Sequence, residues 1–161
     1  NFEDLPFEQW NKVGSTKIEL MYKPSAQMTA RPLRKIASGG EVSRVMLACK
    51  VVLGESDVCD TLVFDEVDAG VGGATAVALA EVLAQLAKTH QVIVVTHLPQ
   101  VAVMASKQYV VSKTEEHNAL PVTSLIEVSG TQREEEIARM LSGSITEASL
   151  AHAHELLSEV R

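Results

Sequence analysis

The sequence predicts an α/β fold in which a mainly parallel sheet is flanked by helices. Two short apolar runs, Thr61–Phe64 and residues 92–95, have the composition of strands covered on both faces of a parallel sheet. A helical pattern at residues 74–88 separates them, and a strand–helix–strand order joins parallel neighbours. The apolar stripe of this helix consists of Leu79, Val82, Leu83 and Leu86.

The segments before this unit are less regular. Residues 1–15 are weakly patterned and form a leading segment, whereas residues 17–22 alternate as an edge strand. Residues 23–35 contain two prolines and several basic side chains, which favours a loop. A long helix is predicted at residues 41–53, with a stop at Gly54. Its predicted buried face consists of Val42, Val45, Met46, Cys49, Val52 and Leu53.

The segments after the unit predict two further strands and three helices. A short helix at residues 100–105 precedes strands at 108–112 and 122–126, which flank a polar turn at 115–118. Two longer helices close the chain. Each is predicted to open with a capping box, in which two side chains three residues apart bond each other's backbone N–H groups. The boxes are Thr131 with Glu134 and Ser144 with Glu147.

Composition narrows the class of protein. A chain of 161 residues with 46% apolar residues can build one domain, or one lobe of a larger one. The net charge of −7 argues against a broad nucleic-acid-binding face. No apolar run approaches the ~18–20 residues of a membrane span, so no membrane contact is expected. Cys49 and Cys59 lack a second pair nearby, which favours a reducing cytoplasm over a disulfide scaffold or zinc site.

Ser38, Gly39 and Gly40 directly precede the first long helix. Two consecutive glycines let the backbone approach a phosphate closely, and the positive end of the helix dipole attracts the anion. The alternative interpretation is that Ser38 only caps the helix, because serine is common at that position. As the first helical residue, Glu41 is expected to point away from a bound phosphate.

Polar side chains follow both predicted buried strands. Asp65 and Glu66 come after the first strand, and His97 lies at the end of the second. Open α/β sheets bind ligands at this edge, where one carboxylate can reach Mg²⁺ while the other polarises an attacking water. A neutral imidazole at His97 can donate to a phosphate oxygen. The alternatives are a solvated turn for the two carboxylates and a packed histidine.

The sequence lacks the Gly-x-x-x-x-Gly-Lys-Ser/Thr loop that holds a nucleotide's own phosphates. It therefore predicts only half of a nucleotide site. Three runs, at residues 36–48, 62–73 and 95–102, closely resemble the RecN family of bacterial DNA repair proteins, which belongs with the SMC-type ABC ATPases. This resemblance extends over roughly residues 18–157.

The resemblance implies that residues 1–161 form a single lobe, the C-terminal half of an ABC-type ATPase head. A coiled coil would precede the leading segment, and the N-terminal lobe of the same protein would carry the phosphate loop. Without that loop the segment is expected to be inactive on its own. The whole protein would be an ATP hydrolase acting in double-strand-break repair and recombination in the bacterial cytoplasm, at the nucleoid. Its heads would form a homodimer around ATP, and other regions would bind DNA.

The resemblance also implies roles for individual residues. Asp65 assists Mg²⁺ through a water, Glu66 is the general base and His97 is the switch histidine. Ser38, Gly39 and Gly40 contact the γ-phosphate of ATP bound on the other subunit. Two departures stand out: Ala37 and Glu41 replace the commonest signature residues, and Gly72 stands where many relatives have an aspartate. Asp68 is then the nearby candidate for the cross-dimer contact of that aspartate.

Two other functions are compatible with these motifs. The first is a nucleotide-binding subunit of an ABC transporter, which a membrane partner would favour and the run at residues 95–102 argues against. The second is a non-hydrolysing interaction module of the same fold, which the presence of Asp65, Glu66 and His97 disfavours.

Overall fold

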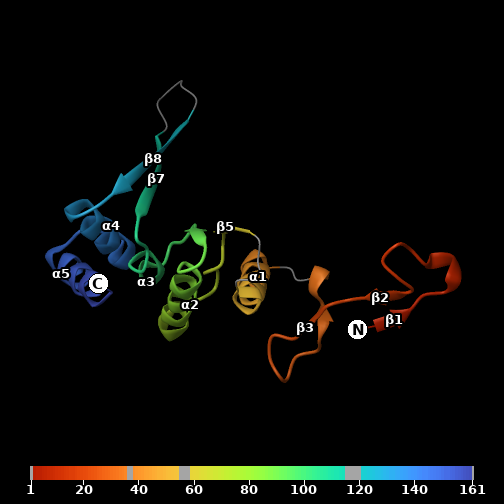
Figure 1. The fold of residues 1–161 in the computed structure, drawn as a ribbon. Coiled ribbons are helices and arrows are strands. Elements are labelled where there is room, and N and C mark those ends of the chain that lie inside the picture. Colours follow the sequence, from red (N-terminus) through yellow and green to blue (C-terminus); the bar gives the residue numbers. More distant parts are fainter. Residues whose placement is uncertain (1, 36–37, 55–58, 115–120, 161) are drawn as a thin grey trace.

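The computed structural model describes residues 2–35, 38–54, 59–114 and 121–160. The elements form an elongated row, with the N-terminal strands at one end and the two C-terminal helices at the other (Figure 1). The class is α/β, as the sequence predicts. Among the described helices none is both long and apolar enough to cross a lipid bilayer.

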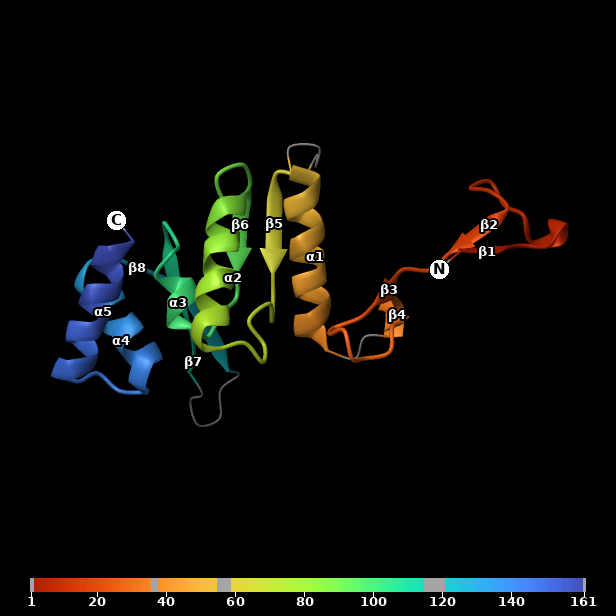
Figure 2. The ribbon, with the colours of Figure 1, turned by 90° about the horizontal axis from the view of Figure 1, so that it is seen from below.

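The centre of the molecule is a parallel pair of strands, β5 (Thr61–Phe64) and β6 (Gln91–Val94), joined through helix α2 (Gly73–Leu86). Helices α1 (Gly39–Leu53) and α2 lie beside the pair (Figure 2). Their apolar side chains meet one face of the strands, and α2 buries most of the predicted stripe. The core consists of Leu47, Leu62, Phe64, Val67, Leu79, Ala80, Leu83, Leu86 and Val101.

The opposite face of the parallel pair is uncovered, which contradicts the prediction that both faces are buried. Val63 is 65% exposed, Ile93 47% and Val95 58%. The composition of the strands correctly indicates two apolar faces. Among the described residues, however, helices cover only one of them.

Helix α1 differs from its prediction in the same way. It begins at Gly39 rather than at residue 41 and ends at the predicted stop, with Gly54 as its C-cap. The buried residues of α1 are Gly40 and Leu47, whereas most of the predicted face is exposed, including Val52 at 85%. The 3.6-residue period correctly identifies an apolar face, but that face points away from the core of this chain.

The described strands form four separate two-stranded sheets rather than one mainly parallel sheet: β5–β6 is parallel, and the other three pairs are antiparallel. Strand β1 (Phe2–Asp4) lies in the predicted leading segment and pairs with β2 (Thr16–Ile18). Strand β3 (Met21–Tyr22) pairs with β4 (Arg31–Pro32), so the predicted strand at residues 17–22 is divided. The connections within these pairs are too short for the crossover that parallel strands need.

The C-terminal part is a hairpin beside a helical pair. Strands β7 (Gln108–Thr114) and β8 (Val122–Val128) project from α3 (Pro99–Ala102), α4 (Thr131–Ser142) and α5 (Glu147–Glu159) (Figure 1). The predicted turn at residues 115–118 lies outside the described residues. A second core, consisting of Ala102, Val103, Ile137, Ala138 and Ala153, joins the three helices.

Both predicted capping boxes are wrong. Gly130 is the N-cap of α4, with a φ of 53° that glycine adopts readily, so Thr131 is already helical. The N-cap of α5 is Thr146 rather than Ser144. Its hydroxyl accepts from the backbone N–H of Ser149, whose own hydroxyl accepts from the N–H of Thr146. Serine thus takes the place of the acidic partner in this box.

Arg133 of α4 fixes the end of the short helix α3. One terminal nitrogen of its guanidinium donates to the carbonyl oxygens of Ala102, Val103 and Ala105, at 3.2, 3.1 and 2.7 Å. Its Nε donates to the buried Gln108 at 3.2 Å. Since α3 begins two residues after His97, Arg133 anchors the far end of the segment that follows this histidine.

We expect Arg133→Met to loosen residues 98–105, because the carbonyl oxygens at the end of α3 lose a charged donor. Hydrogen exchange should detect a decrease of about 1–3 kcal/mol in the free energy of opening of this segment. Arg139→Met is the matched control on the same helix. Arg139 pairs with Glu136 of the same helix through two hydrogen bonds, at 2.7 and 2.6 Å, so its loss should leave the free energy of opening of residues 98–105 unchanged. Equal effects of the two substitutions would contradict this role.

Candidate functional site

The turn that follows β5 lies between the start of α1 and the end of β6. Asp65 and Glu66 are both exposed on this turn, as their predicted roles require. Gly39, at the start of α1, lies directly against the carboxylate of Glu66. His97 is joined to the same turn through Asp68. The structure therefore brings the three predicted groups together around one short segment.

The two glycines of α1 lie close to the turn within this chain. A Cβ at Gly39 would collide with Oε2 of Glu66. A Cβ at Gly40 would lie 2.8 Å from the carbonyl oxygen of Glu66 and 2.8 Å from the Cβ of Ala69. These glycines let α1 approach the turn closely, a reason that the sequence pattern alone does not reveal.

Ser38 stands at the N-cap of α1 with extended backbone angles, φ −104° and ψ 123°. Its side chain forms no capping hydrogen bond with the helix and is exposed. The interpretation of Ser38 as a simple cap therefore finds no support in the structure.

Two polar residues of α1, which the sequence reasoning did not single out, hold the turn. The hydroxyl of Ser43 donates to the carbonyl oxygen of Asp65 at 2.7 Å. Nη1 of Arg44 donates to the carbonyl oxygens of Val67 and Ala69, at 3.1 and 2.8 Å. Their only signal in the sequence is their position, one helical turn after the glycine pair.

The backbone of Glu66 has a φ of 56°, in the left-handed region. A residue other than glycine adopts this conformation at a cost of about 1–3 kcal/mol, so its surroundings must impose it. The N–H of Ala69 donates to the carbonyl oxygen of Glu66 at 3.0 Å, and Gly40 packs against the same oxygen. The carboxylate of Glu66 is thus aimed by a constrained backbone.

The burial of Asp68 contradicts the expectation that this residue forms a cross-dimer contact. A cross-dimer contact needs an accessible side chain, but Asp68 is 2% exposed. Its Oδ2 accepts from the hydroxyl of Thr96 at 2.5 Å and from the backbone N–H of His97 at 3.0 Å. Asp68 therefore connects the ends of β5 and β6 inside the chain and is not available to a second subunit.

The described residues contain no group of three or more histidine, cysteine, aspartate or glutamate side chains arranged to hold a metal ion. Mg²⁺ does not require such a group, since it keeps several waters and binds one or two carboxylates together with substrate phosphates. The exposed carboxylate of Asp65 at the end of β5 suits that mode of binding.

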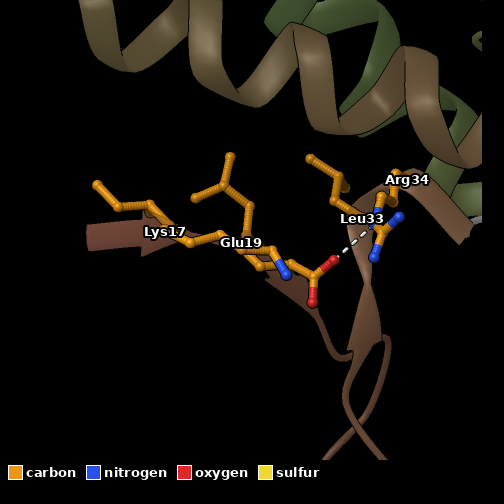
Figure 3. A pocket seen from close by; sticks show the side chains of 6 residues that line it. Lys17, Glu19, Leu33 and Arg34 are labelled. Carbon is orange, nitrogen blue, oxygen red and sulfur yellow. Dashed lines mark hydrogen bonds and ion pairs between the residues drawn. The ribbon is translucent and has the colours of Figure 1, made fainter. Parts of the chain in front are cut away.

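A shallow hollow of about 550 Å³ lies elsewhere, among the N-terminal strands (Figure 3). Glu19 and Arg34 face each other there, with 2.6 Å between Oε1 and Nε. The hydrogen bond from Arg34 lowers the pKa of Glu19. None of the predicted site residues lines this hollow, whose other lining residues are Lys17, Ile18, Leu20 and Leu33.

We expect Gly40→Ala to destabilise the chain more than Gly39→Ala. The new methyl group at position 40 meets a carbonyl oxygen and a Cβ that cannot move freely, whereas the one at position 39 meets the movable end of Glu66. Overpacking of this kind costs about 1–3 kcal/mol. Urea unfolding of the two variants measures the difference. Equal stability would show that α1 does not approach the turn this closely.

The chain is similar to proteins described as "DNA repair protein RecN". It is 47% identical to the one from Streptomyces coelicolor and 50% identical to the one from Mycobacterium leprae, each over 149 residues and 92% of this chain. The protein from Deinococcus radiodurans is 49% identical over 145 residues, 90% of this chain. The chain spans about a quarter of the length of these relatives: 26%, 25% and 25%, respectively.

No protein-family model matches the chain. A solved chain from work on ATP-driven dimerization and DNA-stimulated activation of SMC ATPases aligns with 99% of this chain and 80% of its own length, with 20% identity. Its TM-score is 0.47, and the assignment does not rest on it. Because sequence identity near one half extends over about nine tenths of its residues, the chain belongs to the RecN family of DNA repair proteins.

Proposed function

We propose that this chain is the C-terminal lobe of a RecN-type ATPase head, which binds and hydrolyses ATP between two heads in DNA double-strand-break repair and recombination. One observation carries the proposal: the glycine turn before α1, the carboxylates after β5 and the imidazole after β6 meet around a single turn. Phosphoryl transfer needs groups of these kinds close together, because its catalysis consists mainly of positioning and charge stabilisation.

In this proposal Asp65 would hold Mg²⁺ through a water, and Glu66 would be the general base that takes a proton from the attacking water. When bound, Mg²⁺ neutralises charge that develops on the phosphate oxygens. His97 contacts the γ-phosphate end of the nucleotide. All three side chains are exposed at the carboxyl ends of parallel strands, where such sheets bind their ligands.

The N-terminal lobe of the same protein would supply the phosphate loop and cover the apolar surfaces that this chain leaves open. These surfaces are the outer face of β5–β6, with Val63, Ile93 and Val95, and the outer face of α1. Burying apolar area yields about 25 cal/mol per Å², so the two lobes would form a common core. Residues 1–161 would then act as one lobe, with residues 1–15 leading in from a coiled coil.

Two heads would enclose ATP, with Ser38, Gly39 and Gly40 facing the γ-phosphate bound by the partner head. The side chain of Ser38 is exposed and forms no capping hydrogen bond with α1, which supports this arrangement. DNA would bind other regions of the protein, because this lobe carries a net charge of −7. The small cysteine content, Cys49 and Cys59 with no second pair for a disulfide scaffold, fits a reducing bacterial cytoplasm, where the protein would act at the nucleoid.

We expect the chain alone neither to bind Mg-ATP tightly nor to hydrolyse it. The backbone amides and lysine of a phosphate loop supply much of the grip on a nucleotide, and this sequence has no such loop. Calorimetric titration with Mg-ATP measures the affinity. Micromolar binding by the isolated chain would contradict the division of the site between two lobes.

We expect Glu66→Gln in the full-length protein to slow ATP turnover by about 10²-fold or more, as for the loss of a general base. ATP binding should persist, because glutamine has nearly the same shape and removes a negative charge near the phosphates. Glu81→Gln, an exposed position on α2, is the matched control and should leave turnover unchanged. A Glu66→Gln rate within twofold of wild type would instead favour a non-hydrolysing module.

Ser38→Arg in the full-length protein distinguishes a contact across the dimer from a helix cap. If Ser38 faces the partner's γ-phosphate, arginine is too long for the gap between heads. ATP binding should then survive, while ATP-dependent dimerisation and hydrolysis fail. A cap alone would cost only about 1 kcal/mol of stability and leave association nearly intact.

Mixing decides between action across the dimer and action within one chain. Ser38→Arg protein is combined with protein whose phosphate-loop lysine is mutated. In the heterodimer one site has an intact loop and an intact glycine turn, whereas the other has both defects. Hydrolysis that recovers only in the mixture would support the cross-dimer role. Normal dimerisation of Ser38→Arg protein, with no recovery on mixing, would contradict it.

A further inference from the structure

Asp68 contributes a buried carboxylate that the proposed roles leave unused. It lies two residues after Glu66, and its side chain is 3% exposed. The described hydrogen bonds of its side chain all reach the end of β6 through one oxygen, Oδ2, which accepts from the Thr96 hydroxyl and the His97 backbone N–H. Such an ion is stable away from water only when donors surround it.

The ring of His97 also approaches this oxygen. Nδ1 lies 3.2 Å from Oδ2 of Asp68, whereas the histidine side chain as a whole is 70% exposed. Because Oδ2 already accepts two hydrogen bonds as a carboxylate oxygen, a lone pair on Nδ1 would face negative charge and be repelled. A proton on Nδ1 is attracted instead, so the pair favours the imidazole form that is protonated there.

The guanidinium of Arg44 does not compete for this carboxylate in the described hydrogen bonds. Arg44 donates to the carbonyl oxygens of Val67 and Ala69, on either side of Asp68 in the sequence. The carboxylate is therefore directed toward the β6 end by its own contacts.

We propose that Asp68 is a positioning residue: its carboxylate keeps a proton on Nδ1 of His97 and leaves Nε2 as the ring atom that meets the nucleotide. The inference rests on the proposed function. It also changes the expected role of His97. A neutral ring held in this way accepts a hydrogen bond at Nε2, and it donates to a phosphate oxygen only when Nε2 carries a second proton.

The kinetic test compares four forms of the full-length protein: wild type, Asp68→Asn, His97→Gln and the double variant. An amide at position 68 can donate toward Nδ1 and so favour the wrong tautomer. We expect Asp68→Asn to lower kcat tenfold or more, with KM for Mg-ATP within twofold of wild type. The double variant should be within twofold of His97→Gln, because Asp68 acts through that ring. Multiplicative losses would overturn the proposal.

Thr96→Val is the matched structural control. It removes one donor to Asp68 but leaves the carboxylate beside Nδ1. Its kcat should stay within threefold of wild type. A loss as large as that of Asp68→Asn would mean that Asp68 only ties the end of β6 in place, and would overturn the positioning role.

A spectroscopic measurement covers the case in which Asp68→Asn does not fold. Full-length wild type labelled with ¹⁵N only in histidine reports which ring nitrogen carries the proton, and His97→Gln identifies the signal. We expect neutral His97 to be protonated on Nδ1; protonation on Nε2 would overturn the proposal. Full turnover by His97→Gln would also reject the role of His97 in the proposed function. Loss in His97→Gln with full turnover in Asp68→Asn rejects this inference alone.

Discussion

The turn after β5 is held from two sides, and the predicted site residues take their positions from it. On one side, Ser43 and Arg44 of α1 donate to carbonyl oxygens of the turn. On the other, Thr96 and His97 donate to the buried carboxylate of Asp68. These charged and neutral hydrogen bonds satisfy backbone groups that a tight turn would otherwise leave without partners. They also offset the left-handed backbone of Glu66.

Under the proposed function, this turn links two different ATP molecules. Ser38 and its glycines would face the nucleotide of the partner head, whereas Glu66 would act on the nucleotide of its own head. Gly39 nevertheless lies so close to Glu66 of the same chain that a Cβ at this position would collide with the carboxylate. A shift of α1 on engagement of the partner would therefore change the space available to the carboxylate of Glu66. Under the proposed function, the close approach permitted by the two glycines would connect dimerisation with the chemistry of the bound site.

The sequence predicts the elements whose partners lie in the same chain. Strand β5 and helix α2 match their patterns closely, because their apolar residues pack against each other. It predicts less well where the described residues supply no partner. The apolar faces of α1 and of β5–β6 are real, but periodicity indicates only that a face is apolar, not what covers it.

The candidate site also contains some residues that the sequence reveals and others that it does not. Ser38, Asp65, Glu66 and His97 can be found from their positions at helix and strand ends, where ligands commonly bind. The residues that hold the turn cannot be found in this way. The hydrogen bonds of Arg44 to carbonyl oxygens, for example, form only when α1 and the turn approach each other in space. The burial of Asp68 likewise depends on β6 lying beside β5. The predicted capping box of Thr131 and Glu134 is wrong because the N-cap of α4 is Gly130, one residue before Thr131. Gly130 has a positive φ, which glycine adopts readily.

The most direct measurement is an experimental structure of the full-length protein with Mg²⁺ and a non-hydrolysable ATP analogue. It should reveal two heads, with Glu66 and His97 beside the γ-phosphate of their own nucleotide and Ser38 within hydrogen-bonding distance of the γ-phosphate held by the partner. The outer face of β5–β6 should be covered by the N-terminal lobe. A structure in which Ser38 faces solvent in a closed dimer, or Glu66 points away from both nucleotides, would contradict this account.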